Sequence, residues 1–491
     1  MHQAVITLVL VTGAVLVVLV GATGMVGAAQ LTLKRSHGYM HLVFYAILIM
    51  GALGIFFSGR NLNSDVDLVT PDAPARNALV ALSQPLASLL MVILAGERVI
   101  AHLMKRHRIA DMSPVLLFAF ILFWVGTVAS PALWGAHPLF THNYVYSLVI
   151  GVAAIWSSDV ESDLAIKAVR DMLLLLMVVS LFLIPFKTSL VLDTSYTQGY
   201  IPGVPRFGGL TPHPVEMGSL AQLCLLCLMV RPYHRAWLNR AAWALALLVF
   251  FLAQAKTSWL GFLLCSACIV AIRSGPSFWR RVSDPLRPEF GVLCVSVFMA
   301  GVLALTLFLM FGHPDSKLTN FFSSPEGEQL STLTGRIQIW AVAYDEWLRH
   351  PVFGYGPSIW DESFRTSIGM PFATHAHNQF LDILSRSGSV GAASFVIYAL
   401  VLLILSVRYA RVSSGLTLAL FLMIAVRSIS EVPLTLFGYS DDLVAHLLLL
   451  MTLAGAASEM RTRKVQLAAT HQRLAPLQSA ADSMASAGFN S

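Results

Sequence analysis

Charged residues are scarce in this sequence. Lys, Arg, Asp and Glu make up only 12% of its 491 residues, whereas hydrophobic residues make up 56%. A soluble domain usually carries about 25% charged residues, so this chain cannot cover a globular surface with polar groups. The scarcity excludes an ordinary soluble protein and indicates an integral membrane protein, with lipid covering part of its surface.

Cysteines are also few, and their setting excludes a thiol-based metal or redox site. The chain has five, namely Cys224, Cys227, Cys265, Cys268 and Cys294. Two CxxC pairs among them have the spacing of zinc or redox motifs, but all five lie in apolar runs. A thiolate would be desolvated there, so we interpret the cysteines as small apolar helix residues.

The basic residues do not form a pattern that is typical of nucleic-acid binding. The formal net charge is +6, but the sequence has no basic run with interleaved aromatic residues, which a groove for a single strand needs. We therefore expect no nucleic-acid partner.

Apolar stretches long enough to cross a bilayer recur along the chain. We expect an all-α polytopic membrane protein with about 12–14 transmembrane helices, and the most consistent number is thirteen. The expected spans are approximately 4–29, 38–57, 78–96, 115–135, 143–157, 168–187, 216–230, 240–256, 258–272, 289–312, 388–406, 414–434 and 440–458. Lys256, Thr257 and Ser258 mark the expected break between the eighth and the ninth.

The distribution of Lys and Arg between the loops predicts the orientation in the membrane. Most of these cations fall in one set of alternate loops, which begins at Lys34 and Arg35 and includes the C-terminal tail. We therefore expect the N-terminus outside and the C-terminus in the cytoplasm. The first span follows Met1-His2-Gln3, which has no Lys or Arg, so we interpret it as a retained helix and not a signal peptide.

Two expected outer segments differ from the short basic loops. One covers about 188–215 and contains most of the string RFGGLTPHPVEMG, which is residues 206–218. The other covers about 313–387. Long connections are uncommon unless they are functional, so we expect the site in the second. The chain then divides into spans at 1–312, a large outer loop at 313–387, further spans at 388–460 and a mobile cytoplasmic tail at 461–491.

The large loop combines a helix pattern with three short motifs. Apolar residues at a spacing of three or four predict an amphipathic helix over 335–348. The strings GRIQIW, HPVFGYGPSIW and HNQFLDILSRSGSVG follow one another within 335–391. They resemble the C-terminal signature of the O-antigen ligase and Wzy-type polysaccharide polymerase family, G-R-x3-W, P-x2-G-x-G and H-N-x2-L-x2-L-x3-G-x2-G. RFGGLTPHPVEMGSLA and AQAKTSWLG also resemble family motifs, and GYGPSIW is closer to the exopolysaccharide polymerases than to the ligases.

The resemblance implies a membrane glycosyltransferase with a fold related to the GT-C enzymes. Such an enzyme transfers a glycan from undecaprenyl pyrophosphate to a sugar hydroxyl at the outer face of the bacterial inner membrane, with no metal or cofactor. We expect a polymerase of lipid-linked oligosaccharide repeat units in exopolysaccharide or O-antigen assembly, working with a flippase and a chain-length regulator. The alternative is a ligase that transfers glycan to lipid A-core or to protein.

A polysaccharide transporter or flippase is a third hypothesis. Many spans and intramembrane charges suit a transporter. However, transporters usually contain internal repeats and broken helices at the midplane, and the sequence shows no convincing repeat. A large outer loop with one set of motifs is also not needed for transport.

The implied reaction requires cations for the departing pyrophosphate and a base for the acceptor hydroxyl. Arginine binds phosphate bidentately, and the outer segments offer Arg206, Lys256 and Arg336. Ligases of the family usually have arginine near the position of Lys256. Histidine titrates near neutral pH, and His377 matches the family position of the base.

Other polar residues are candidates for substrate binding. Arg427 and Glu431 lie four residues apart on one expected span, where an ion pair marks a functional site by default; a bridge that only packs helices is the alternative. The further candidates are Asn378, which we expect to cap or orient its segment, His375, His213 and Glu216.

Overall fold

The chain folds as an all-α bundle with a small layer of loops and short helices at one end. The computed structural model describes residues 2–35, 37–63, 78–104, 114–195, 201, 203–283, 336–371, 373–438 and 441–487, with parts of 289–303. The elements are α1 (His2–Lys34), η1 (Met40–Leu42), α2 (Val43–Phe57), α4 (Ala78–Met104), α5 (Pro114–Trp124), the π-helical turn η3 (Val125–Ala129), α6 (Ser130–Trp134), α7 (Asn143–Ile155), α8 (Asp159–Phe182), α9 (Thr188–Val191), β1 (Leu192–Asp193), β2 (Arg206–Phe207), α10 (Pro214–Val230), α11 (Ala236–Leu252), α12 (Lys256–Val282), α16 (Arg336–Arg349), α17 (Glu362–Ser367), α18 (Gln379–Tyr409), α19 (Leu416–Ser430) and α20 (Asp441–Ala487).

The helices are apolar enough to form a multi-pass membrane protein. Within the described part of the chain, six helices have the length and hydropathy of a membrane span, and five shorter helices are also apolar. Helices coincide with every expected span except that of 289–312, which lies mostly outside the described residues. The expected break at Lys256 is also present, because α11 ends at Leu252 and α12 begins at Lys256.

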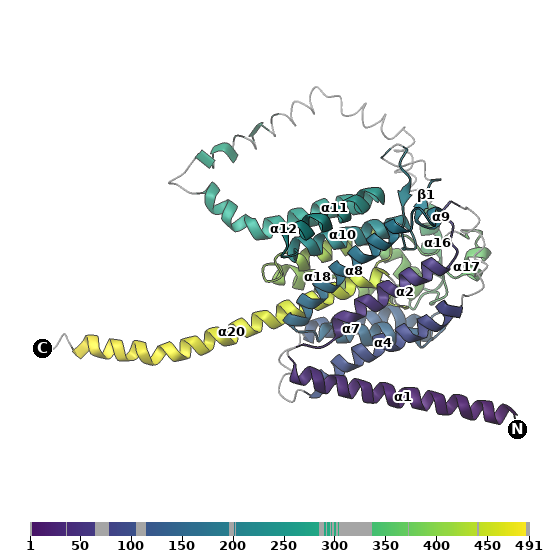
Figure 1. The fold of residues 1–491 in the computed structure, drawn as a ribbon, viewed down its shortest axis with the longest axis horizontal. Coiled ribbons are helices and arrows are strands. Elements are labelled where there is room, and N and C mark those ends of the chain that lie inside the picture. Colours follow the sequence, from purple (N-terminus) through teal and green to yellow (C-terminus); the bar gives the residue numbers. More distant parts are fainter. Residues whose placement is uncertain are drawn as a thin grey trace.

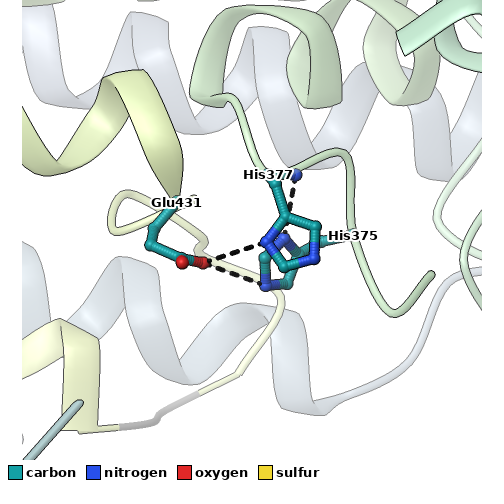
Figure 2. A group of neighbouring side chains, drawn as sticks. All are labelled: His375, His377 and Glu431. Atoms are coloured by element: carbon teal, nitrogen blue, oxygen red, sulfur yellow. Dashed lines mark hydrogen bonds and ion pairs between the residues drawn. The ribbon is translucent and has the colours of Figure 1, made fainter. Parts of the chain in front are cut away.

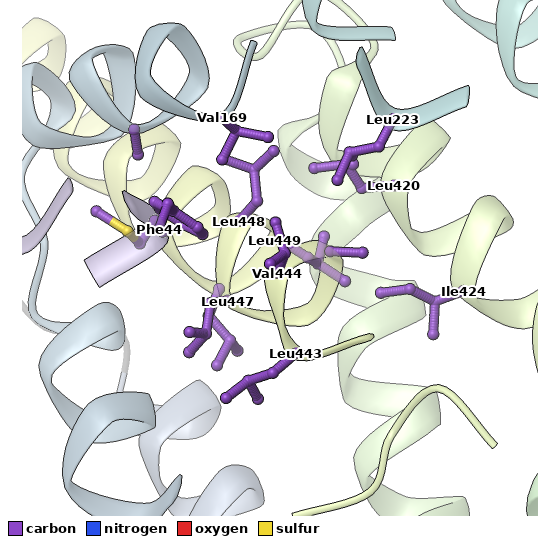
Figure 3. Packing of buried hydrophobic residues seen from close by; sticks show 14 of the residues in the cluster. Phe44, Val169, Leu223, Leu420, Ile424, Leu443, Val444, Leu447, Leu448 and Leu449 are labelled. Atoms are coloured by element: carbon purple, nitrogen blue, oxygen red, sulfur yellow. The ribbon is translucent and has the colours of Figure 1, made fainter. Parts of the chain in front are cut away.

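The first half of α20 forms the centre of the bundle. It packs against α7, α8 and α19, and its residues Val444, Leu448 and Leu449 are completely buried among apolar side chains of α8 and α2 such as Val169 and Phe44 (Figure 3). The second half of α20 extends away from the bundle (Figure 1). The tail expected to be a mobile end is thus the continuation of α20, helical as far as Ala487.

The loops that were expected outside lie together at one end of the bundle. α9, β1, α16 and α17 lie at the same end, and the second half of α20 leaves from the opposite end (Figure 1). The amphipathic helix expected over 335–348 is α16, which packs against α18. Its buried residues Ile339 and Ala343 form a second, small apolar cluster with Trp360 and Phe364.

A kink divides α18 at the boundary where the large loop was expected to end. Gly388 has φ 63° and ψ −162°, which is outside the helical region. In a continuous helix, the N–H groups of 389–390 would donate to the carbonyls of 385–386. Here they donate to the carbonyls of 351–352 at 2.8 and 3.2 Å, and the carbonyls of 385–386 accept from the N–H groups of 355–356 at 2.9 and 3.0 Å. The PVFGYG segment therefore satisfies these four backbone groups.

Replacing Gly388 with alanine is expected to destabilise the protein by about 1–3 kcal/mol. A Cβ at this position would lie 2.3 Å from the carbonyl oxygen of Val352, and the positive φ is unfavourable for alanine. Thermal unfolding of the purified variant in detergent measures the change as a lower Tm. Gly275→Ala is the matched control, since a Cβ there meets nothing within 4 Å; an equal Tm for the two variants would contradict the account.

Candidate active site

The segment before α18 is fixed in place by hydrogen bonds from three sides. The side-chain oxygen of Asn378 accepts from the N–H of Leu381 at 3.1 Å and so caps α18, as expected. The buried Asp382 accepts from the N–H of Ala376 at 3.2 Å. The indole N–H of Trp340 on α16 donates to the carbonyl of Ala376 at 2.9 Å. The GRIQIW motif is therefore in direct contact with the residue that precedes HNQFLD.

These contacts hold His377 in a rarely adopted backbone conformation. Its φ is 47°, in the left-handed region, which is uncommon for residues other than glycine and often occurs at functional sites. In this conformation the N–H of His377 donates to Nδ1 of His375 at 3.0 Å. The two imidazole rings lie side by side, with their centroids 4.1 Å apart.

Both histidines and Arg336 converge on the carboxylate of Glu431. Nδ1 of His377 and Nε2 of His375 lie 3.3 and 3.4 Å from Oε2 of Glu431 (Figure 2). A guanidinium nitrogen of Arg336 lies 3.6 Å from Oε1. The four side chains are partly exposed, with Glu431 the most buried at 16%. The structure thus brings Arg336 and His377 together through a residue from a third segment.

The position of Glu431 follows from the end of α19. The helix ends at Ser430, and Glu431 is its C-cap residue with an extended backbone of φ −148° and ψ −177°. The side chain of Glu431 therefore leaves the helix surface and points to the loop of the two histidines. The segment that follows is anchored to α18, because the N–H of Leu434 donates to the side chain of Gln379 at 2.8 Å.

The charges around Glu431 favour its ionised form. Burial raises the pKa of Glu431, but the hydrogen bond with His377 and the charges of His375, His377 and Arg336 outweigh burial and leave the pKa below its ordinary value. Burial lowers the pKa of His375, the neighbouring His377 lowers it further, and Glu431 offsets this only in part. Glu431 is thus a carboxylate and His375 a neutral imidazole at neutral pH.

The same three side chains have the composition of a metal site, but their hydrogen bonds favour another role. One ligand atom of each of His375, His377 and Glu431 lies within 4.8 Å of the others. However, Nδ1 of His375 already accepts the N–H of His377. The proton of the neutral ring is therefore on Nε2, which lies 3.4 Å from Oε2 of Glu431, whereas a metal ligand needs a lone pair at that atom. The arrangement is a hydrogen-bond network around a carboxylate.

The outer segment 188–215 lies beside this network. Arg206, which is buried, donates from Nε to the carbonyl of Ala253 at 2.9 Å and so connects the loop to the end of α11. Nδ1 of His213 accepts from the N–H of Val215 at 3.2 Å and caps α10. The charges of both Arg206 and Glu431 act on His213, so the loop and the network are neighbours.

Arg60 holds the outer segment 188–215 in shape. Its two terminal nitrogens donate to four backbone carbonyls, those of Leu190, Gly209, Thr211 and Pro212, at 2.5–3.1 Å. An arginine that binds carbonyls from two segments fixes their relative position. This role could not be recognised from the sequence, because the carbonyls belong to residues more than a hundred positions away.

Residues 241–396 match the family model described as O-antigen ligase. This segment contains α12, α16, α17 and the kink of α18, with all three motifs of the large loop. The chain has an O-antigen ligase domain. Proteins with this domain are membrane glycosyltransferase-like ligases and polymerases, so the domain supports a ligase- or polymerase-type role in O-antigen assembly. A comparison with curated proteins finds no match.

The O-antigen ligase domain contains only part of the candidate site. Arg336, His375 and His377 lie inside the matched segment, but Glu431 lies beyond it. Lys256 is also inside, as the exposed first residue of α12. The carboxylate on which the domain's histidines and arginine converge is thus supplied by the residue that follows α19.

The expected ion pair of Arg427 with Glu431 is wrong. Arg427 pairs with Asp442 at 2.6 Å and donates to the hydroxyl of Ser219 at 2.9 Å. The spacing of four residues would bring the two side chains together only if the helix continued, and α19 ends before Glu431. Glu216 on α10 lies close enough to Arg427 and Asp442 to interact with both charges.

Two further residues that support the O-antigen ligase motifs were not predicted from the sequence. Arg386 donates from Nε to Asp382 at 3.2 Å and from a terminal nitrogen to the carbonyl of Pro357 at 2.5 Å. Asp382 in turn holds the N–H of Ala376. Both residues are part of HNQFLDILSRSG, and their spacing of four on one helix was the signal that could have identified the pair.

The network predicts the protonation state of His375. We expect ¹⁵N NMR of histidine-labelled protein, assigned with His375→Gln, to show a neutral Nε2–H ring at pH 6.5. Glu431→Gln should lower the pKa of His375 further, because it removes the negative charge that favours the protonated ring. A ring protonated at both nitrogens at pH 6.5, or an Nδ1–H tautomer, would contradict the proposed hydrogen bonds.

Proposed function

We propose that this protein polymerises oligosaccharide repeat units linked to undecaprenyl pyrophosphate. In this reaction a glycan moves from its lipid pyrophosphate to a hydroxyl of a second sugar, without a metal or nucleotide sugar. The observation that supports this proposal is the convergence of Arg336 and His377 on Glu431. In this proposal Arg336 is the cation for the departing phosphate and His377 is the base, and the two contact different oxygens of one carboxylate.

His377 is proposed to be the base for the acceptor hydroxyl. Because Glu431 is ionised, it can only accept hydrogen bonds, so Nδ1–H of His377 donates to it. Nε2 then keeps its lone pair and can take the hydroxyl proton as the new bond to the sugar forms. A carboxylate that orients a histidine and stabilises its protonated form has the same effect in serine proteases.

Arg336 is proposed to bind the pyrophosphate as it departs. The bond between the sugar carbon and the phosphate oxygen breaks, and its electron pair stays on the pyrophosphate. Arg336 has several N–H donors, and its contact with Glu431 occupies only one side of the guanidinium. We propose that Arg206, Lys256, His213 and Glu216 complete the binding of the pyrophosphate and sugars, and that Arg427 keeps its helix in place through Asp442.

The reaction is proposed to take place at the periplasmic face of the inner membrane. The bias of Lys and Arg toward the opposite loops supports this orientation, with the N-terminus periplasmic and the C-terminus cytoplasmic. The lipid-linked repeat unit would then be supplied by a flippase, and product length would be set by a chain-length regulator. These partners are part of the proposal.

A ligase is the second candidate function, because the matched family model is described as O-antigen ligase. The chemistry at the donor is identical, and only the acceptor differs. A polymerase would use a second lipid-linked repeat unit, and a ligase would use lipid A-core or a protein. The resemblance of GYGPSIW to polymerases favours the first.

Arg336→Ala and His377→Ala are expected to reduce glycan transfer strongly. Removal of one donor to the departing charge typically costs about 10²–10³ in rate, and loss of a general base costs about 10²–10⁴. Each variant is expressed in cells that lack the native protein, and glycan length and yield are measured by gel electrophoresis. Arg349→Ala is the matched control, because Arg349 is an exposed arginine at the other end of α16.

The product that accumulates distinguishes the two functions. A defective polymerase leaves single repeat units on the final acceptor, whereas a defective ligase leaves finished polymer on its lipid. If both variants give the same glycan length and yield as Arg349→Ala, the enzyme hypothesis is wrong. A transporter that needs neither residue would give that result.

A further inference from the structure

A polar pocket lies at the end of the bundle opposite to the candidate active site. At this end α8 begins, α10 ends and the second half of α20 extends away (Figure 1). The pocket has a volume of about 380 Å³, and its lining contains the carboxylates of Asp159, Asp163 and Glu459 together with several hydroxyl groups and one guanidinium. All the lining residues lie outside the O-antigen ligase domain.

Most of the charges inside the pocket are already paired. Asp163 forms ion pairs with both Lys167 and Arg231, and Glu459 is paired with an arginine on the next turn of α20. Asp159, the first residue of α8, is exposed and has no ion-pair partner among the residues that the structure describes. The pocket therefore contains one negative charge that is not compensated.

Arg273 of α12 lies at the rim of the pocket. One terminal nitrogen donates to the carbonyl of Met229 at 2.8 Å, and Nε donates to the carbonyl of Ser414 at 3.2 Å. The neighbours of these two residues, Val230 and Ser413, line the pocket. Within the described part of the chain, no carboxylate forms an ion pair with Arg273. The rim thus has one positive charge that is not compensated.

These two charges are complementary to a zwitterion with an ammonium and a phosphate. Carboxylates and hydroxyls accept the N–H groups of an ammonium, and a guanidinium binds phosphate strongly. A ligand with a phosphate alone would meet the negative charge of Asp159, and a ligand with an ammonium alone would leave Arg273 without a partner. The phosphoethanolamine group carries both charges a few bonds apart.

Exposed apolar side chains connect the rim to the membrane. α12 is long and apolar enough to cross a bilayer, and Arg273 lies 17 residues after its first residue, Lys256. Since about 20 helical residues cross a bilayer, Arg273 lies at the level of the lipid headgroups. Val270, one turn earlier, and Leu263, two turns before that, are 53% and 66% exposed on the same side of the helix.

We infer that this pocket binds the headgroup of phosphatidylethanolamine, with the ammonium at Asp159 and the phosphate at Arg273. The acyl chains would lie along α12, over Val270 and Leu263. Such a lipid would connect α8 to α12 at the end of the bundle that the proposed reaction does not use. The inference goes beyond the proposed function and does not depend on it.

The test measures lipid binding by native mass spectrometry of the purified full-length protein. The variants are Asp159→Asn and Arg273→Gln, and Arg240→Gln is the matched control, because Arg240 is an exposed arginine of α11 that does not line the pocket. The probes are phosphatidylethanolamine, phosphatidylglycerol, which has no ammonium, and free phosphoethanolamine, which has no acyl chains. Val412→Trp fills the pocket from the loop before α19 and replaces Arg273→Gln if that variant does not fold.

Each pocket variant is expected to raise the Kd of phosphatidylethanolamine roughly tenfold, because it removes one charge-assisted hydrogen bond. The wild type should bind phosphatidylethanolamine more tightly than both other probes, and Arg240→Gln should bind it as the wild type does. Equal Kd values in the wild type and both pocket variants would overturn the inference, as would an equal loss in Arg240→Gln. Equally tight binding of phosphatidylglycerol would contradict the ammonium site, and equally tight binding of free phosphoethanolamine would contradict a lipid ligand.

Discussion

The carboxylate of Glu431 is the point on which the candidate active site depends. A partly buried charge is unfavourable unless it is paired, and Glu431 is paired with two imidazoles and a guanidinium. These partners come from α16 and from the loop before α18. Without the carboxylate, Arg336 and the two histidines would have no common partner. One residue thus connects groups from two other segments.

A kink in α18 connects this helix to the segment that precedes it in the large loop. A straight α18 would satisfy its own backbone and leave the 351–356 segment without partners. The kink at Gly388 releases two N–H groups and two carbonyls, and the segment binds all four. This exchange explains in physical terms why P-x2-G-x-G and the glycine after H-N-x2-L-x2-L belong to one signature. Each motif supplies the hydrogen bonds that the other lacks.

Much of the bundle and part of the site could be predicted from the sequence. Apolar length locates the spans, because a helix must satisfy its backbone inside lipid. The spacing of apolar residues predicts α16, and Asn378 before a helical segment predicts its cap. Local rules of this kind need only neighbouring residues, which the sequence provides directly.

Contacts between distant segments could not be predicted in this way. The partner of Arg427 depends on where α19 ends, and sequence spacing alone assigned it to Glu431 and not to Asp442. The four carbonyls bound by Arg60 are visible only in the folded chain. The helical structure of the C-terminal tail was not predicted for another reason. Its small polar residues gave no sign that α20 continues to Ala487.

A double-mutant cycle of Glu431→Gln and His377→Gln tests the central relation most directly. If Glu431 acts by orienting His377, its loss should matter little once the imidazole is gone. The account predicts that the double variant transfers glycan as slowly as His377→Gln alone, and not more slowly. If the two losses multiply, Glu431 acts independently of His377, and the proposed role of the carboxylate is contradicted.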